Sequence, residues 1–256
     1  MKNIVCIKWG EKFSSEYVNK LYNSVQRNLS LNHRFICLTD NAEGIVAGVE
    51  TLPIPRADLK ICWNKLALFD RGIHSIEGQI LFLDLDVVIV DSIDDLFLFQ
   101  PESEFVSIKE WVSVDYSMLD VTPFNASAMR FNVGAFPFIV EDFYAERGVT
   151  LLEEIFFDEA GSELGQPEKI TYNDLEGFPP RVFNGDQEWE YYMLRKNNIK
   201  IDYYPEGWLA SYRYVDRTGG LYDEVAEFDS KVKVIVFHGT PKPEQVSDEI
   251  VMKNWR

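Results

Sequence analysis

The sequence predicts an α/β fold in which a mostly parallel sheet is flanked by helices. Residues 3–8 and 34–39 are short apolar segments typical of buried strands, and a helical pattern lies between them. A further apolar segment, Ile80–Leu83 (ILFL), follows a second helical pattern at Trp63–Phe69. Strands that alternate with helices are typical of a parallel, doubly wound sheet.

The first helix has a recognisable start. Ser14 suits the N-cap position, and Glu16 lies in the first turn, where the helix dipole favours an acid. Apolar residues then recur at helical spacing as far as Leu29. Residues 49–54 are a further short strand, which Pro53 and Pro55 bring to an end.

The second half of the chain is less regular, and its expected elements are of mixed type. They are strands at Phe105–Ile108, Ala128–Phe131 and Val232–Phe237, a helical pattern at Phe143–Phe157 that Gly148 interrupts, a loop at Ser162–Pro180 and a helix at Asp186–Asn197. No internal repeat or low-complexity linker separates the halves, so we expect a single domain over residues 1–256.

The charge of the chain argues against a nucleic-acid partner. Lys and Arg number 25 against 42 Asp and Glu, which gives a formal net charge of −17. Such a field repels nucleic acids and anionic lipids unless a block of Lys or Arg overrides it, and the sequence has no such block. A negatively charged small ligand would therefore need a metal cation to enter.

Neither a membrane span nor a signal peptide is expected. No apolar segment has the length needed to cross a bilayer, and the residues before Lys8 read as a strand. We therefore expect a cytoplasmic protein, either free or peripheral at the membrane. Cys6, Cys37 and Cys62 lie in apolar stretches without metal-like spacing, so reduced, buried thiols are expected.

The strongest chemical signal is the pair Asp84 and Asp86, which follows the apolar strand at 80–83. Residues two apart lie on the same face of a strand, and ligands bind outside the carboxyl ends of strands in open α/β sheets. Two hard oxygen ligands there suit Mg²⁺ or Mn²⁺. The alternative is two solvated acids in a loop, or one helix cap and an uninvolved neighbour.

A second signal is the segment VFHGTPKP at residues 236–243. His238 follows a buried strand, and a neutral imidazole can ligate a transition metal. Lys242 lies four residues further on, where an ammonium can neutralise a diphosphate. The alternative is a histidine that bonds a backbone carbonyl. His33 and His74 are expected at the surface.

The third signal is the pair Asp186 and Gln187, which would begin a helix after a tight turn at Gly185. Together they offer acceptor and donor groups for sugar hydroxyls, although plain helix capping by Asp186 explains the acid equally well. Asn125 and Asn132 each begin a cluster of small and polar residues, and each either presents an amide to a hydroxyl or forms a turn.

These residues, in this order, resemble the GT-A glycosyltransferases, and among them the family-eight retaining enzymes such as glycogenin and the bacterial lipooligosaccharide galactosyltransferases. The resemblance spans nearly the whole chain and implies a GT-A-like fold. It rests on an aliphatic strand that ends in D-x-D, an upstream basic residue in a helix, an Asn-small segment, an Asp-Gln pair and a His-Gly-Lys-Pro segment. The matching residues are Asp84 and Asp86, Lys65, Asn125 (with Asn132 as the alternative), Asp186 and Gln187, and His238, Gly239, Lys242 and Pro243.

The resemblance also implies a function. Asp84, Asp86 and His238 would bind Mn²⁺ or Mg²⁺, and Lys65 and Lys242 would contact a nucleotide-sugar donor. That donor is expected to be a UDP-hexose, and the acceptor a hydroxyl of a glycan or glycolipid. Residues 1–90 would be the nucleotide-sugar-binding half, and residues 91–256 the half that binds the acceptor and completes the metal site. The implied reaction is hexosyl transfer with retention.

Two other functions remain as alternatives. A haloacid-dehalogenase-like phosphatase also has a strand that ends in Asp-x-Asp, but that motif normally lies near the start of the chain, and it leaves residues 236–243 unexplained. A sugar-nucleotide-binding domain without catalytic activity is the other alternative, and the intact Asp84–Asp86 pair argues against it.

Overall fold

The computed structural model describes residues 1–71, 73, 76–111, 124–144, 170–172, 181–183, 185–213 and 228–256, with the backbone alone at 170–172 and 181–183. Its helices are α1 (Ser15–Asn28), η1 (Ile61–Phe69), α2 (Asp94–Leu98), α3 (Phe138–Tyr144), α5 (Asp186–Lys196), η3 (Pro243–Gln245) and α6 (Glu249–Asn254). Its strands are β1 (Lys2–Lys8), β2 (His33–Thr39), β3 (Glu50–Leu52), β4 (Gln79–Leu83), β5 (Val87–Ile89), β6 (Phe105–Lys109), β7 (Phe124–Asn132), β8 (Ile170–Tyr172), β9 (Arg181–Phe183), β10 (Ile201–Tyr203), β11 (Leu209–Ser211) and β12 (Val234–Val236).

The main sheet is mostly parallel, as the sequence predicts. Among the described residues it has seven strands in the order β10-β6-β7-β4-β1-β2-β3. The pairs of β1 with β2 and β4, of β2 with β3, and of β6 with β10 are parallel. The exception is β7, which runs antiparallel to both β4 and β6. An α/β fold of helices on a mostly parallel sheet is therefore confirmed, but the sheet is mixed at its centre.

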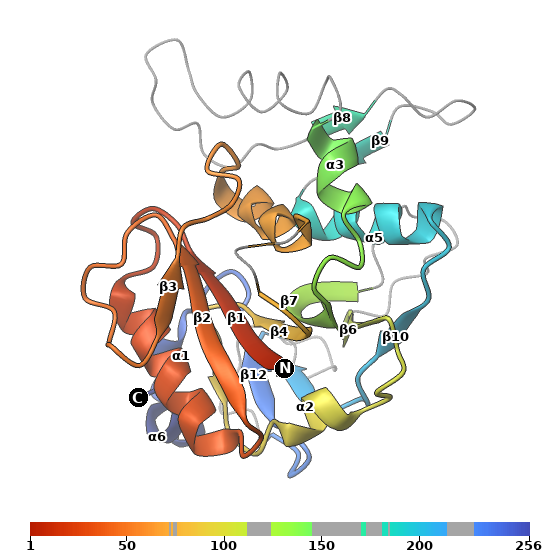
Figure 1. The fold of residues 1–256 in the computed structure, drawn as a ribbon. Coiled ribbons are helices and arrows are strands. Elements are labelled where there is room, and N and C mark those ends of the chain that lie inside the picture. The colour runs from red at the N-terminus through yellow and green to blue at the C-terminus, as the bar shows by residue number, and fades with distance from the viewer. Residues whose placement is uncertain are drawn as a thin grey trace.

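Both faces of the main sheet are buried, because successive residues of a strand point to opposite sides. Val5 and Phe82 belong to a core that also contains residues of η1, α3 and α5. Their neighbours Ile4 and Leu81 belong to a second core, against α1 and α2. Figure 1 shows η1, α3 and α5 gathered above the sheet and α1 along its side, next to α6. The sheet is thus a middle layer between two groups of helices.

Several local predictions are corrected by the structure. The loop expected at Ser162–Pro180 contains β8, which pairs antiparallel with β9; the rest of that segment lies outside the described residues. Most of the helical pattern at Phe143–Phe157 also lies outside them, and the described helix there, α3, begins earlier, at Phe138. The helix expected at Trp63–Phe69 is a 3-10 helix. His33 is partly exposed and lies in β2, and His74 is not among the described residues.

A smaller sheet lies beside the main one, in the order β11-β12-β5. β12 pairs in parallel with β11 and antiparallel with β5. Because β5 directly follows the Asp84–Asp86 turn and β12 ends two residues before His238, this pairing brings Asp86 and His238, which are 152 positions apart in sequence, to neighbouring places. The sheet therefore positions the two strongest sequence signals together.

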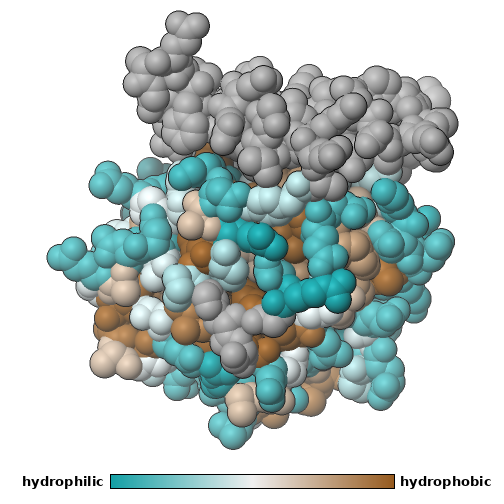
Figure 2. All heavy atoms as spheres, turned by 45° about the horizontal axis from the view of Figure 1, so that its top comes forward, coloured by the Kyte–Doolittle hydropathy of each residue, from teal (hydrophilic) through white to brown (hydrophobic). Residues whose placement is uncertain are grey.

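The exposed surface offers no large apolar area in the view of Figure 2, where hydrophilic and hydrophobic residues are mixed below the grey atoms. The large hydrophobic side chains that are exposed among the described residues are Met1, Val46, Leu98 and Met252, which belong to different elements. Within the described residues, no helix is both long enough and apolar enough to span a membrane. Cys6 and Cys37 are buried free thiols, and Cys62 is free and partly buried.

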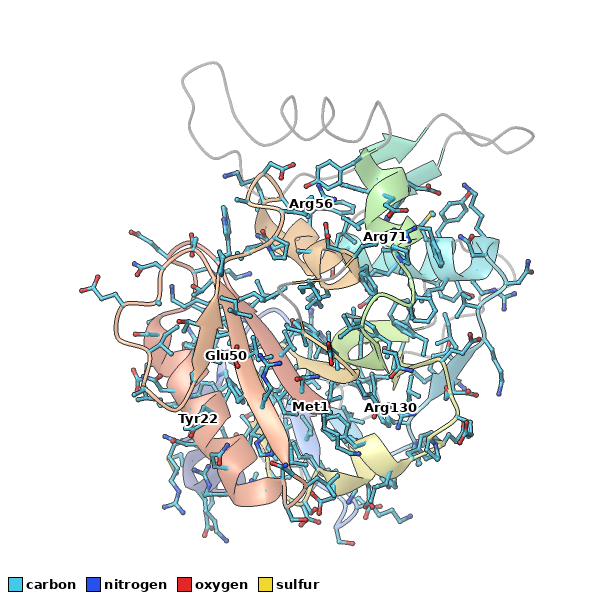
Figure 3. All side chains as sticks on the ribbon, viewed as in Figure 1. Met1, Tyr22, Glu50, Arg56, Arg71 and Arg130 are labelled. Carbon is cyan, nitrogen blue, oxygen red and sulfur yellow. The ribbon has the colours of Figure 1, made fainter. Side chains whose placement is uncertain are left out.

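A buried arginine fixes the end of α2. The guanidinium of Arg130, on β7, is fully buried and donates to the carbonyl oxygens of Leu96 (3.1 Å), Phe97 (3.0 Å), Phe99 and Gln100 (2.8 Å). Figure 3 labels Arg130 next to this helix. The last carbonyls of a helix have no intrahelical partner, so a planar group with several donors satisfies several of them at once.

We expect Arg130→Lys to lower the free energy of unfolding by about 1–3 kcal/mol, because lysine cannot reach all of these carbonyls and leaves buried acceptors unsatisfied. Urea unfolding measures the loss. The control is Arg71→Lys, since Arg71 pairs with Glu141 on the surface (2.5 Å) and should tolerate lysine without a change in midpoint. Equal behaviour of the two variants would contradict the helix-capping role of Arg130.

Candidate active site

Asp84 and Asp86 lie in the turn between β4 and β5, not on a strand, which corrects the strand-face argument made from the sequence. The turn is held at both ends by backbone hydrogen bonds. The amide of Asp84 donates to Ser127 O (2.9 Å), and the carbonyl of Asp86 accepts from the amide of Phe237 (3.2 Å). The turn that carries both acids is therefore anchored by β7 at one end and by the segment after β12 at the other.

Asp84 and Asp186 share the ammonium of Lys65. Lys65 Nζ lies 3.0 Å from Asp84 Oδ1 and 3.4 Å from Asp186 Oδ2. Burial opposes the charge of Lys65, but the nearby carboxylates, above all that of Asp186, outweigh it and raise the pKa of Lys65. Lys65 is thus a charged centre between η1, the β4–β5 turn and α5.

The Asp-Gln pair forms the start of α5. Gly185 is the N-cap residue and Asp186 the first residue of the helix, so Asp186 does not serve as the cap. Gly185 has an extended backbone, φ 177°, rather than the tight turn expected from the sequence. Gln187 Oε1 accepts a hydrogen bond from the backbone amide of Ala126 (3.1 Å), which ties the helix to the beginning of β7.

The two candidate asparagines lie at opposite ends of β7. Asn125 precedes the residues that pair with the carboxyl end of β4, whereas Asn132 pairs with Gln79 at the other end. The side chain of Asn125 accepts from the amide of Ser127 (3.0 Å), and its carbonyl accepts from Ser107 Oγ (2.8 Å). Asn125 therefore lies at the end of the strand where Asp84 is held, and Asn132 does not.

Lys242 returns to the same turn from the end of the chain. Its ammonium forms an ion pair with Asp86 and lies 3.4 Å from the carbonyl oxygen of Phe237. Gly239, which has φ +74°, allows the chain to reverse after β12 because this left-handed conformation favours glycine. Glu244, two residues beyond Lys242, accepts a hydrogen bond from Tyr17 of α1 (2.5 Å).

His238 is held by groups that the sequence did not indicate. Its Nε2 lies 2.6 Å from Ser211 Oγ, and its ring stacks on that of Trp111 with centroids 5.3 Å apart and an interplanar angle of 4°. Burial, followed by the positive charges of Arg213 and Lys242, lowers the pKa of His238 to about 4. The imidazole is therefore neutral near pH 7, which is the form that ligates metals.

The donor set has the right chemistry for a divalent cation, with two carboxylates and a neutral imidazole. Burial, and then the negative charge of Asp84, raise the pKa of Asp86, so an added cation would relieve a repulsion that the protein contains. The same residues have protein partners in this structure, since Lys65 and Lys242 neutralise the acids and Ser211 contacts His238. Within the described residues, no three His, Cys, Asp or Glu side chains are gathered around one point in the manner of a metal site.

One further acid belongs to the cluster and was not among the predicted site residues. Glu190, on α5, is fully buried, and Asp186 and Asp84 both interact with it electrostatically. The sequence could have indicated that Glu190 lies near Asp186, because it follows Asp186 by four residues and therefore lies on the same helix face. Ser211 and Trp111 carry no such signal, since both reach His238 only through the tertiary fold.

The fold is shared with solved glycosyltransferases. The galactosyltransferase LgtC, in complex with donor and acceptor sugar analogs, is 14% identical and superposes with a TM-score of 0.57 over 94% of this chain and 88% of LgtC. A similar match is an active-site mutant of LgtC in which glutamate replaces a glutamine. GlyE of Streptococcus pneumoniae TIGR4 matches with 11% identity and a TM-score of 0.60, over all of this chain and 61% of GlyE.

The bifunctional glycosyltransferase WbbM in its apo form is 13% identical, with a TM-score of 0.58 over 98% of this chain and 49% of WbbM. No protein-family model and no curated protein sequence matches this chain. The expected fold class is confirmed, because the mixed α/β architecture of this chain is that of glycosyltransferases of known structure.

We expect Lys65→Met to destabilise the protein by about 3–5 kcal/mol, because it leaves the buried carboxylate of Asp186 and the partly exposed carboxylate of Asp84 without their cation. Burial already raises the pKa of Asp186, so protonation at low pH should relieve the defect and rising pH should enlarge it. Urea unfolding across a pH series measures this.

The matched control is Lys20→Met, which removes a lysine from the surface pair with Glu16 (3.0 Å). This variant should show little change at any pH. A loss in Lys65→Met that does not depend on pH would speak against the buried ion pair as its cause.

Proposed function

We propose that this protein is a metal-dependent glycosyltransferase that moves a hexose from a nucleoside-diphosphate sugar to a hydroxyl acceptor. The observation that carries the proposal is the convergence of Asp84, Asp86, Lys65 and Lys242 at the carboxyl end of β4. Ligands of open α/β sheets bind at this end of the strands. The shared fold with LgtC, GlyE and WbbM supports the same reaction class by analogy.

Asp84, Asp86 and His238 would hold the cation, as Mn²⁺ or Mg²⁺. When bound, such a cation neutralises the diphosphate and stabilises the charge that develops on the leaving group. In this structure the ammonium of Lys242 pairs with Asp86. When the donor binds, the Lys242 side chain would exchange this partner for an oxygen of the diphosphate. Gly239 would let the backbone of this loop approach the same phosphates.

Lys65, Asp186 and Gln187 would hold the transferred sugar. Asp186 is fixed by Lys65, and Gln187 by the amide of Ala126, so their remaining atoms are already oriented. A carboxylate at this position stabilises the positive charge that grows on the sugar as the glycosidic bond breaks. LgtC has an active-site glutamine, and we propose that Gln187 serves this site. Asn125 would contact the donor from the beginning of β7.

The finer assignments follow from the resemblance. We propose a UDP-hexose as donor, a glycan or glycolipid hydroxyl as acceptor, and transfer with retention. We also propose that the protein works in the cytoplasm or at the face of a membrane. The phosphatase alternative gains no support, because the matching structures are glycosyltransferases.

A hydrolysis screen across sugar nucleotides tests the proposed function. Purified protein is incubated with each nucleotide sugar and Mn²⁺, and the release of nucleoside diphosphate is followed. The proposal expects slow hydrolysis of one or a few donors, and none of generic phosphomonoesters. Phosphomonoester hydrolysis would support the phosphatase alternative, and the absence of both activities with tight donor binding would support a binding domain.

Turnover should depend on a divalent cation. We expect excess chelator to abolish it and Mn²⁺ to restore it at least as well as Mg²⁺, because an imidazole ligand favours the softer ion. Asp86→Ala should remove most turnover while the protein still folds. The control is Asp91→Ala, an exposed acid five residues further on, which should keep full turnover. Full activity in chelator would remove the metal from the proposal.

Asp186→Asn should lower kcat by an amount equivalent to about 2–4 kcal/mol, the scale of one preorganised electrostatic group. The substitution keeps the shape of the side chain but removes the charge that would stabilise the developing positive centre. Binding of the bare nucleoside diphosphate, measured by calorimetry, should be nearly unchanged because that ligand has no sugar. Unaltered turnover would exclude Asp186 from the catalytic residues.

A further inference from the structure

Glu190 is a buried acid that the proposed reaction does not use. It lies on α5, one helical turn after Asp186, on the face that also carries Trp189 and Met193. Its side chain is 0% exposed, and neither carboxyl oxygen has a hydrogen-bond partner. An ionised carboxylate in such a place, without a donor, is among the most costly groups a protein can bury.

The groups that face Glu190 come from three elements of the described structure. They are Asp186 on the same helix, Lys65 on η1 and Asp84 in the turn after β4. Lys65 is the cation of this group, and its ammonium already lies 3.0 Å from Asp84 and 3.4 Å from Asp186. Three carboxyl groups therefore depend on one ammonium, and Glu190 is the one without a contact to it.

One ammonium cannot balance three carboxylates, so one of these acids should carry a proton. Of the three, Glu190 is the one that should carry it. Burial raises the pKa of Asp186 as well, but the ammonium of Lys65 lies 3.4 Å from its Oδ2 and a hydrogen bond with Cys62 also favours the anion, whereas neither carboxyl oxygen of Glu190 has a hydrogen-bond partner. Burial, and then the charge of Asp186, raise the pKa of Glu190 well above its usual value, and Lys65 opposes this only in part. A neutral acid removes the cost of an unpaired buried charge.

We propose that Glu190 is a positioning residue that remains protonated behind Asp186 and so leaves the ammonium of Lys65 to Asp84 and Asp186. If Glu190 lost its proton to water, its carboxylate would compete for Lys65 and draw the ammonium away from both acids. The positioning role rests on the proposed function, since Asp186 and Asp84 are there the sugar-binding and metal-binding acids. The protonated state of Glu190 does not rest on it.

The protonated state is tested on the protein alone by urea unfolding between pH 5 and pH 9. The unfolded chain ionises Glu190 above its ordinary pKa of about 4.3, while the folded chain keeps the proton, so wild-type stability falls as pH rises. Glu190→Gln cannot take up this proton. The free energy of unfolding of Glu190→Gln, relative to that of wild type, should therefore rise with pH. The slope should correspond to about one proton that only the folded wild type binds.

Two further variants make this result decisive. Glu190→Met is also neutral and of similar size, and it should show the same slope. It takes the place of Glu190→Gln in the test if that variant does not fold. The control is Glu102→Gln, an exposed acid, whose stability should run parallel to wild type across the series. Parallel curves for wild type and both Glu190 variants would overturn the proposal.

The positioning role is tested by the pH profile of donor hydrolysis. Glu190→Gln should keep neutral-pH turnover within about twofold of wild type and should retain it at alkaline pH, where wild type declines as Glu190 ionises. Coincident profiles, or loss of turnover at neutral pH in a folded variant, would overturn that role. If no sugar nucleotide is hydrolysed by wild type, the proposed function fails, and the unfolding series still decides the state of Glu190.

Discussion

The ammonium of Lys65 joins three segments that lie far apart in the sequence. It extends from η1 to Asp84, in the turn after β4, and to Asp186, at the start of α5. Asp186 is buried and Asp84 is partly exposed, so the cost of an unpaired charge falls mainly on Asp186, whose carboxylate the ammonium of Lys65 compensates. The placement of α5 against the sheet therefore depends on this one charge, with Gln187 and its bond to the amide of Ala126 as a neutral second tie. Packing of α5 on η1 and α3 brings these groups together, and the ion pairs then select a single arrangement among similar packings.

Local signals in the sequence predicted the elements that have enough length to show a period. β1, α1 and β2 agree with their predicted bounds to within about a residue, because alternating or helical apolar patterns are properties of the segment itself. The direction of β7 could not be predicted in this way, since a strand reads the same whichever way its neighbours run. Three short elements, β5, β11 and α6, were not predicted, and the first two are strands of three residues that are defined by their pairing with β12.

The candidate site likewise contains residues that a local pattern indicates and contacts that only the tertiary fold creates. Residue type and spacing selected Asp84 and Asp86, because few roles other than ion binding explain acids at the end of an apolar strand, whereas Lys65 was selected only through the resemblance to a known family. Which cation faces which acid could not be derived, since Lys242 reaches Asp86 across 156 positions of the chain. Glu190 was not assigned to the site for a different reason. An acid within a helix is normally solvated, and only the burial of that helix face on η1 makes it unusual.

The charge balance of this cluster explains why an acidic protein would need a cation to bind an anionic donor. If Glu190 is counted as neutral and Asp84, Asp86 and Asp186 as carboxylates, these three acids paired with the ammoniums of Lys65 and Lys242 leave one net negative charge in the described site. The chain as a whole carries −17, so the surrounding field is also repulsive to a diphosphate. On the proposed function, one divalent cation would change the local sum to a net positive charge, and Lys242 could then leave Asp86. An ionised Glu190 would restore a neutral sum even with that cation present, and the site would lose its attraction for the donor. The proposed protonation of Glu190 and the proposed binding of one metal ion would in this way meet the same electrostatic requirement.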